Sequence, residues 1–302
     1  MERPSKRQNE PGRMPGIPSG EAAKAQLRRQ GCQAADRIGF MTKYAADIDA
    51  VCEAADRIAA YAHHTPVVTC STLDRMAGRR LFFKCEQFQK AGSFKFRGAC
   101  NTLMKLPGEA LGQGVVTHSS GNHAQALALA AKLRGCVVHL VMPRTASPIK
   151  RQAVEGYGGT VHLCEPTLAA RQETAARVAA ETGAVMVSPF DQPDIIAGQA
   201  TAALELLADV PDLDAIVAPV GGGGLISGTV IAVGKSTRDV GVFAAEPAGA
   251  DDAARSLASG CSLHRTCPLA RLCEQLTVMG GTVRNIRLSP AVSGAGWSWC
   301  WS

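Results

Sequence analysis

Two patterns of apolar residues alternate along the chain between residues 48 and 246. Short apolar runs bounded by turn residues predict buried strands, and longer segments with apolar residues at helical spacing predict helices. The predicted strands are residues 81–83, 114–117, 136–142, 160–164, 184–187, 216–219 and 242–246. The predicted helices are residues 48–59, 122–134, 168–182, 195–207 and 225–234. Gly135 and Gly183 stand where the C-terminal caps of two of these helices belong.

This alternation of strands and helices predicts an α/β fold. Repeated βα units build a parallel sheet that helices cover on both faces. Such sheets bind their ligands at the carboxyl ends of the strands. We therefore look for chemistry in the segments that follow predicted strands.

The two ends of the chain differ from the part between them. Residues 1–40 hold several prolines and no apolar segment, so we expect a disordered extension rather than a secretory signal. Residues 261–302 hold all three Trp and four of the 11 Cys, and the βα pattern stops after Gly260. We expect an atypical tail there, produced by a frameshift or a miscalled end near Gly260.

Charge and composition exclude several classes of protein. The net charge is +6, but residues 41–260 hold 20 basic and 21 acidic residues, so the excess lies in the two ends. This part has no basic cluster, so we expect no nucleic-acid partner. The uncharged residues 216–234 include Pro219 and four consecutive glycines, which indicate a strand, a loop and a helix rather than a membrane span. Cysteines without a C-x-x-C pair fit a reducing cytoplasm.

Three glycine-bearing segments stand at the ends of predicted strands, at residues 92–99, 117–123 and 219–225. The third carries four consecutive glycines ahead of a predicted helix. Backbone N–H groups at a helix N-terminus bind anions, and glycine lets them approach closely, so this segment predicts a phosphate cradle. The alternative is a flexible turn, although four glycines lose much conformational entropy on folding.

A nicotinamide cofactor is the other ligand that this glycine segment could take. Glu246 stands at a strand end, where a dinucleotide fold places its ribose-binding acid. However, Ser227 occupies the position of a third glycine, and no Lys-Ser/Thr pair of a Walker motif follows. We therefore expect a single phosphate. A single phosphate and Lys95 between two Phe residues suggest pyridoxal phosphate, because a desolvated lysine forms a Schiff base with the cofactor aldehyde.

Several segments in unbroken order resemble one family, the fold-type II pyridoxal-phosphate enzymes of the serine/threonine dehydratase (threonine ammonia-lyase) and serine racemase group. The matching segments are residues 92–99, 119–126, 189–191, 196–199, 221–225 and 245–247. The resemblance implies two open parallel-sheet domains of the tryptophan synthase β-subunit-like kind. Residues 110–191 would form a small domain inserted into a large domain of residues 41–109 and 192–260, with the cofactor in the cleft. It also implies a homodimer.

The resemblance assigns cofactor roles to matched positions. Lys95 would be the Schiff-base lysine and the base on one face of the cofactor. Phe94 would pack beside the pyridine ring, and Asn122 would bond the phenolic oxygen. The phosphate would be held by the backbone N–H groups of Gly221, Gly222, Gly223, Gly224 and Leu225.

The resemblance also assigns the site of the substrate. The turn of Ser119, Ser120, Gly121, Asn122 and His123 would receive the carboxylate of an L-amino acid at a helix N-terminus, which also makes electrostatic sense. The hydroxyl of Ser120 matches the group that racemases place on the face opposite the lysine.

A divalent metal site is a further implication of the resemblance. Glu246 and Asp252 would supply carboxylates and Ala250 a carbonyl oxygen. Such a set suits Mg²⁺ or Ca²⁺. The alternative is a pair of solvated loop acids.

The reaction that we expect is β-elimination of L-threonine or L-serine to 2-oxobutanoate or pyruvate and ammonia. We favour elimination because residues 189–191 look more like bacterial threonine dehydratases. Serine racemisation on the same scaffold is the alternative. The family continues past residue 260 through further βα units, including a serine for the pyridine nitrogen that we do not find here. A truncated, non-catalytic product is therefore the alternative of another class.

Overall fold

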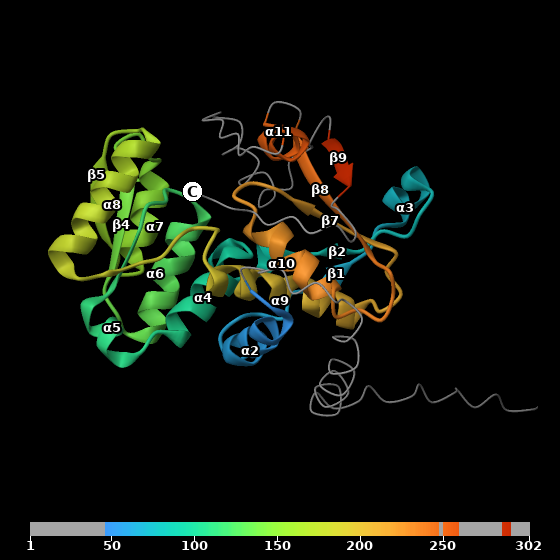
Figure 1. The fold of residues 1–302 in the computed structure, drawn as a ribbon, viewed down its shortest axis with the longest axis horizontal. Helices are drawn as coiled ribbons and strands as arrows, with labels where there is room; N and C mark the ends of the chain where they lie inside the picture. The colour runs from blue at the N-terminus through green and yellow to red at the C-terminus, as the bar shows by residue number, and fades with distance from the viewer. Residues whose placement is uncertain (1–45, 248–249, 260–285, 291–302) are drawn as a thin grey trace, which may run out of the picture. The chain divides into compact units, whose positions relative to one another are not determined.

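A parallel sheet of four strands forms one part of the fold in the computed structural model, which describes residues 46–247, 250–259 and 286–290. Its strands lie in the order β5-β4-β3-β6 (Figure 1). All pairs are parallel, and Val115 of β3 stands opposite Val138 of β4. The strands are β3 (Val115–Thr117), β4 (Val138–Pro143), β5 (Thr160–Cys164) and β6 (Val185–Met186).

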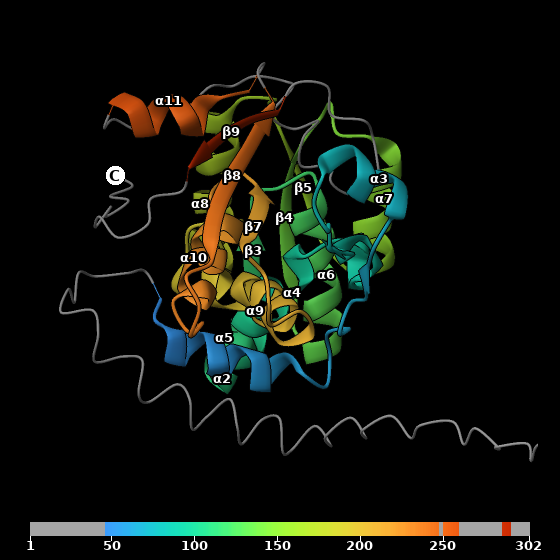
Figure 2. The ribbon, with the colours of Figure 1, turned by 90° about the vertical axis from the view of Figure 1, so that its right-hand side faces the viewer.

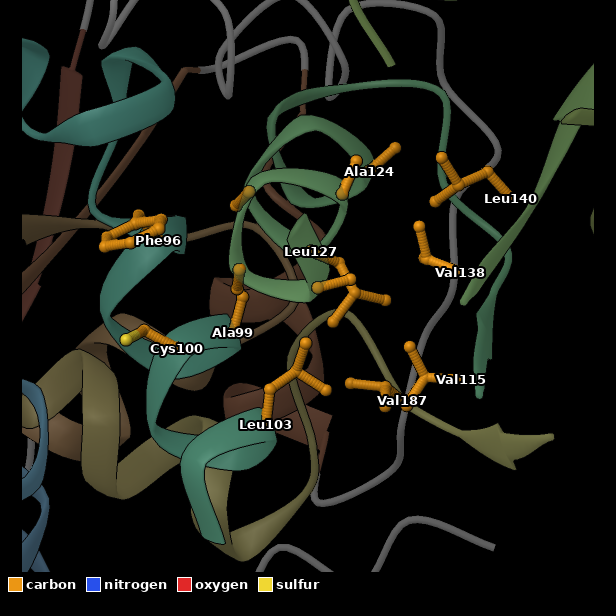
Figure 3. Packing of buried hydrophobic residues seen from close by; sticks show 14 of the residues in the cluster. Phe96, Ala99, Cys100, Leu103, Val115, Ala124, Leu127, Val138, Leu140 and Val187 are labelled. Carbon is orange, nitrogen blue, oxygen red and sulfur yellow. The ribbon is translucent and has the colours of Figure 1, made fainter. Parts of the chain in front are cut away.

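Helices cover both faces of this sheet, as the alternation predicts. Because side chains point to alternate faces along a strand, Val115 packs with helices α4 (Lys95–Lys105) and α6 (Asn122–Arg134), while Val116 packs against α8 (Leu168–Thr182). Figure 3 shows the first of these two cores, where residues of α4 and α6 meet the strands. α4 thus lies between this sheet and the rest of the fold.

Two helices have the bounds that the sequence predicts. They are α6 and α8, and each ends at a glycine in the left-handed region. Gly135 and Gly183 both have φ of 74°, and their N–H groups donate to Ala131 O and Ala179 O. The other predicted helices are observed with small shifts as α2 (Ile48–Ile58), α9 (Pro193–Asp209) and α10 (Gly224–Val233).

α4 and α9 approach each other unusually closely. A Cβ added at Gly198 would lie 2.5 Å from Gly98 Cα, and one added at Gly98 would lie 2.7 Å from Ile195 O. Only glycine permits this separation. α2 and α10 pack on the same helix α9.

A second sheet has the strand order β7-β8-β9, and Figure 2 shows its strands side by side with α10 below them. β7 (Ala215–Pro219) and β8 (Gly241–Pro247) are parallel, as expected. β9 (Ile286–Pro290) runs antiparallel to β8 and lies in the segment where we expect no further strand. The sheet is therefore mixed.

The expectation that residues 81–83 join a parallel sheet is wrong. β2 (Phe83–Lys84) instead pairs antiparallel with β1 (Val67–Val68) in a separate ribbon. The physical reason is the charge of Lys84, which forms ion pairs with Glu205 and Asp209 of α9. This short run therefore belongs to an ion-pair network rather than to the core of a sheet. The other helices among the described residues are α3 (Ser71–Ala77), η2 (Glu86–Phe88), η3 (Lys90–Gly92), α5 (Gly108–Gln113), α7 (Pro148–Gly156) and α11 (Asp252–Ser259).

Several predictions about the ends and borders stay open. Residues 1–40 lie outside the described residues, and so does the tail 261–302 apart from β9. The domain borders at residues 110 and 191 stay a prediction. Within the described ranges, none of the helices combines the length and the hydropathy that crossing a bilayer requires.

Candidate active site

Lys95 lies at the first position of α4 and is almost fully buried. Its Nζ donates a hydrogen bond to Pro189 O at 3.1 Å and lies 5.2 Å from the centroid of the Phe94 ring. A lysine in this position is rare, because burial of an ammonium is costly without compensation. The predicted lysine is thus an interior amine at the start of a helix rather than a surface residue.

The four glycines form the turn between β7 and α10, as predicted. Gly223 has φ of 84° and caps α10 without a side chain. A Cβ at Gly222 would lie 2.3 Å from Phe190 Cγ, and one at Gly224 would lie 2.6 Å from Phe190 O. The turn therefore packs its backbone directly onto Phe190, which a residue with a side chain could not do.

The segment of Pro189 and Phe190 joins the lysine to the glycine turn. The carbonyl of Pro189 accepts from Lys95, and the next residue contacts Gly222 and Gly224. Lys95 and the glycine turn are more than 120 residues apart in the sequence, yet they meet through two consecutive residues. The sequence shows residues 189–191 only as a match to the family and gives no sign of this linking role.

The third predicted segment is the turn between β3 and α6. Gly121 is the N-cap of α6, and no side chain caps this helix. The N–H of Gly121 donates to Ser119 Oγ at 3.3 Å, which keeps the turn closed. Ser120 and Asn122 are half-buried. The amide groups of this helix start suit a carboxylate.

His123, at the end of this turn, is close enough to Lys95 for the charge of the lysine to affect its pKa. Burial, together with the charges of Lys95 and His118, lowers the pKa of His123 to about 3, against an opposing effect from the backbone of Val187. Its ring nitrogens make no hydrogen bond of ordinary geometry to the described residues. A neutral, buried imidazole without such bonds is unusual and indicates a site prepared for a polar ligand.

His118 is a functional candidate to which the sequence assigns no role. It follows β3 directly and is half-buried. Burial lowers its pKa, and Arg171 lowers it further, while Asp191 opposes this shift. The sequence does place His118 directly before Ser119, and this neighbourhood could have indicated a role in the site.

These residues fit pyridoxal phosphate. The site offers an interior amine, a glycine turn at a helix N-terminus and a buried, neutral imidazole. A phosphate suits the turn because backbone N–H groups at a helix start favour anions. When bound, the cofactor delocalises the electrons that a substrate leaves behind on proton loss.

The predicted metal ligands lie near one another, but Glu246 is already engaged. Its carboxylate accepts hydrogen bonds from Ala253 N at 3.0 Å and Ala254 N at 2.8 Å, at the start of α11. Burial raises the pKa of Glu246, the two backbone bonds oppose this, and Asp252 and Asp251 add to the rise. Within the described ranges, no three side chains from His, Cys, Asp and Glu could hold a metal ion together. The Glu246, Ala250 and Asp252 set, with its carbonyl ligand, stays a prediction.

Acidification should destabilise the fold through His123. Because its pKa is about 3 in the folded chain and 6.5 ordinarily, the unfolded chain takes up the proton first, and stability falls as the pH drops from 6.5 toward 3. When the pH falls from 7.5 to 5.5, we expect the free energy of unfolding to decrease by about 1.4 kcal/mol less in His123→Gln than in the wild type. Urea unfolding at both pH values measures this. Equal losses in both proteins would show that His123 also titrates in the folded chain.

Comparison with known proteins identifies the family. A family model described as pyridoxal-phosphate dependent enzyme matches residues 58–285. Serine racemase of Arabidopsis thaliana is 51% identical over 218 residues, which cover 72% of this chain and 66% of the racemase. Beta-hydroxyaspartate dehydratase of Paracoccus denitrificans is 49% identical over 205 residues, which cover 68% of this chain and 65% of the dehydratase.

A solved structure agrees with the sequence relatives. The structure of maize serine racemase superposes with a TM-score of 0.72 at 49% identity, over 74% of this chain and 68% of the maize chain. The matched part thus spans about two thirds of these relatives. The match over residues 58–285 and the fold agree, and the chain belongs to the family of fold-type II pyridoxal-phosphate dependent enzymes.

Proposed function

We propose that the chain binds pyridoxal phosphate at Lys95 and racemises serine. The observation that carries the cofactor site is the contact of Pro189 with Lys95 and of Phe190 with the glycine turn. The preference for racemisation rests on the similarity to serine racemases. This corrects the order expected from the sequence, where elimination came first.

In this proposal, one residue transfers the proton and its neighbours hold the cofactor. We propose that Lys95 takes and returns the α-proton on one side of the substrate. Its side chain is almost fully buried, so the amine lies inside the site rather than in bulk solvent. The hydrogen bond to Pro189 O fixes Nζ at the linking segment. Phe94 would pack beside the cofactor ring, and Asn122 would bond its phenolic oxygen.

Recognition of the substrate carboxylate falls to the turn before α6. The turn of Ser119, Ser120, Gly121, Asn122 and His123 lies at a helix start without a side-chain cap, where backbone N–H groups favour a carboxylate. The side chain of His123 is neutral, so it can hydrogen-bond a ligand without adding a charge.

Ser120 distinguishes racemisation from elimination in this proposal. A racemase needs a proton donor on each side of the α-carbon, and the Ser120 hydroxyl would serve the side opposite Lys95. Elimination needs only the lysine and a proton for the leaving hydroxyl. It is our second candidate, because a dehydratase is nearly as similar to the chain as the racemases are.

Replacing Ser120 with alanine tests this division. We expect D-serine formation from L-serine to fall by about 10²-fold or more, since one general acid is lost. Pyruvate formation should change less than about threefold, because Lys95 remains. Both products are measured in one reaction, and the exposed Ser71→Ala on α3 is the control. Parallel loss of both products would contradict the role of Ser120.

Further parts of the proposal follow the family. The chain would act on a small L-amino acid and form a homodimer. Mg²⁺ or Ca²⁺ would bind at Glu246, Ala250 and Asp252, where each carboxylate oxygen of Glu246 accepts one backbone hydrogen bond and keeps a second lone pair. The cytoplasmic location and the absence of nucleic-acid and membrane partners stay predictions.

A further inference from the structure

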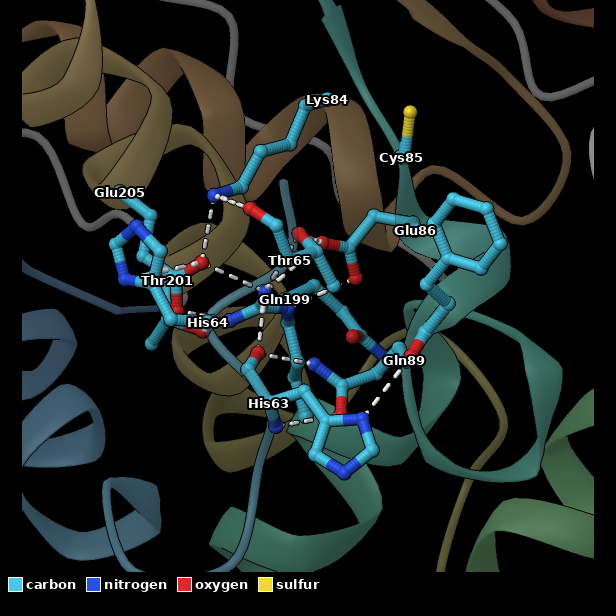
Figure 4. Close-up of polar contacts among 12 residues, drawn as sticks. His63, His64, Thr65, Lys84, Cys85, Glu86, Gln89, Gln199, Thr201 and Glu205 are labelled. Carbon is cyan, nitrogen blue, oxygen red and sulfur yellow. Dashed lines mark hydrogen bonds and ion pairs between the residues drawn. The ribbon is translucent and has the colours of Figure 1, made fainter. Parts of the chain in front are cut away.

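Arg97 is a fully buried cation two residues after Lys95. Figure 4 shows members of the polar network to which it belongs, among them Glu86, Thr201 and Glu205. Its Nε and Nη2 donate to Glu86 at 2.8 Å, and its Nη1 and Nη2 donate to Glu205 at 2.6 and 2.8 Å. Nη1 also donates to Thr201 Oγ1 at 3.2 Å. Planar donors bonded to two carboxylates hold an arginine in one orientation.

The two carboxylates come from separate parts of the chain. Glu86 lies in η2 and accepts a further bond from Thr65 Oγ1 at 2.6 Å. Glu205 lies on α9 and pairs with Lys84 at 2.8 Å. Burial tends to raise the pKa of Glu205, but Arg97 and then Lys84 hold it below its ordinary value. The network thus fixes Arg97 against both η2 and α9.

The first turn of α4 needs such an anchor. Lys95 is its first residue, and the N-cap position is Phe94, which provides no capping hydrogen bond. No turn of α4 itself precedes Lys95, because Lys95 is the first residue of this helix. The close contact of Gly98 with Gly198 fixes the distance between α4 and α9, but glycines provide no side chains to fix the direction of the turn.

Arg97 anchors this turn from the side opposite the lysine. Successive residues of a helix are about 100° apart, so Lys95 and Arg97 point about 200° apart around α4. One side of the turn carries the amine toward Pro189, and the other carries the guanidinium to Glu86 and Glu205. A shift of the guanidinium would therefore move the amine as well.

We propose that Arg97, clamped between Glu86 and Glu205, is a positioning residue that sets where the Lys95 amine meets pyridoxal phosphate. This inference rests on the proposed cofactor site. A misplacement of about 1 Å at a reacting group can cost about 10²-fold. The network would thus control both cofactor affinity and the reactivity of the lysine.

Glu205→Gln is the sharpest test, because it keeps the shape of the side chain and removes its charge. We expect the dissociation constant of pyridoxal phosphate to rise at least tenfold in an absorbance titration. The fraction of cofactor that borohydride fixes to Lys95 should fall in the same samples, as measured by peptide mass spectrometry. Titrations are made well below the unfolding midpoint of each variant, so loss of stability alone leaves both readouts unchanged.

Asp194→Asn is the matched control. It removes an ion pair between the same two helices, that of Lys105 Nζ with Asp194 at 2.6 Å, at the far end of α4. We expect affinity and fixation to stay within twofold of the wild type. Thr201→Val serves if Glu205→Gln does not fold, because it removes only one acceptor of Arg97 and keeps both carboxylates. There we expect a threefold to tenfold rise of the dissociation constant.

The outcomes separate the two proposals. A wild-type chain that binds no pyridoxal phosphate would refute the cofactor site, and this inference with it. A wild type that binds it, with folded Glu205→Gln and Thr201→Val variants of unchanged affinity and fixation, would refute the positioning role alone. An equal loss in Asp194→Asn would also refute it, since any contact between the two helices would then have the same effect.

Discussion

Replacing Lys95 with alanine should abolish the visible absorbance band of bound pyridoxal phosphate and reduce turnover of L-serine by about 10³-fold or more. The side chain is buried at the start of α4, and its Nζ reaches the linking segment at Pro189 O. Alanine removes both the amine that would bond the cofactor and the base that would move the α-proton. The fold should remain, because alanine is a good helix former.

Lys105→Ala on the same helix is the control for this variant. Lys105 is half exposed and forms a surface ion pair with Asp194, so its loss should change stability by less than about 1 kcal/mol and leave the band intact. A Lys95→Ala protein that keeps the visible band would show that another lysine bonds the cofactor. Reduced activity with a normal band would restrict Lys95 to proton transfer.

Gly222→Ala should weaken pyridoxal phosphate binding by at least about tenfold and lower stability by about 1–3 kcal/mol. The added Cβ would lie 2.3 Å from Phe190 Cγ and 2.7 Å from Phe190 Cβ. A change of rotamer can move Cγ but not Cβ, which is fixed to the backbone, so either Phe190 or the glycine turn must move. Movement of Phe190 would also displace Pro189 and the Lys95 hydrogen bond. One methyl group thus disturbs both halves of the site.

Gly112→Ala is the matched control, because a Cβ there meets nothing within 4 Å and the residue lies in helix α5. It should bind the cofactor as the wild type does and be as stable or slightly more stable. An absorbance titration and a urea unfolding curve measure both quantities for each variant. Normal cofactor affinity in Gly222→Ala would contradict the assignment of this turn to the phosphate.

Local sequence patterns predict those elements whose ends are determined by interactions within the element itself. Helices α6 and α8 end at glycines in the left-handed region. These ends can be predicted from the sequence, because glycine is the residue that most readily forms a left-handed C-cap. The ribbon of β1 and β2 was not predictable, since the pairing of Lys84 with Glu205 joins residues far apart in the chain. The antiparallel β9 follows no local signal either, because pairing direction depends on the route of the chain.

The site was predictable as a set of motifs but not as an arrangement. The lysine and the two turns are visible as segments, whereas the linking role of Pro189 and Phe190 depends on packing. Arg97 looks like an ordinary charged helix residue in the sequence. Its burial becomes understandable only once Glu86 and Glu205 are seen beside it. The preference for racemisation likewise came from relatives rather than from the motifs.

Fixing the cofactor to the chain tests the central claim most directly. The protein is mixed with pyridoxal phosphate, reduced with borohydride and digested, and mass spectrometry locates the modified lysine. We predict that the phosphopyridoxyl group lies on Lys95, with Lys84, Lys90 and Lys105 unmodified at stoichiometric cofactor. Modification of another lysine in place of Lys95, or of none, would contradict the proposed active site.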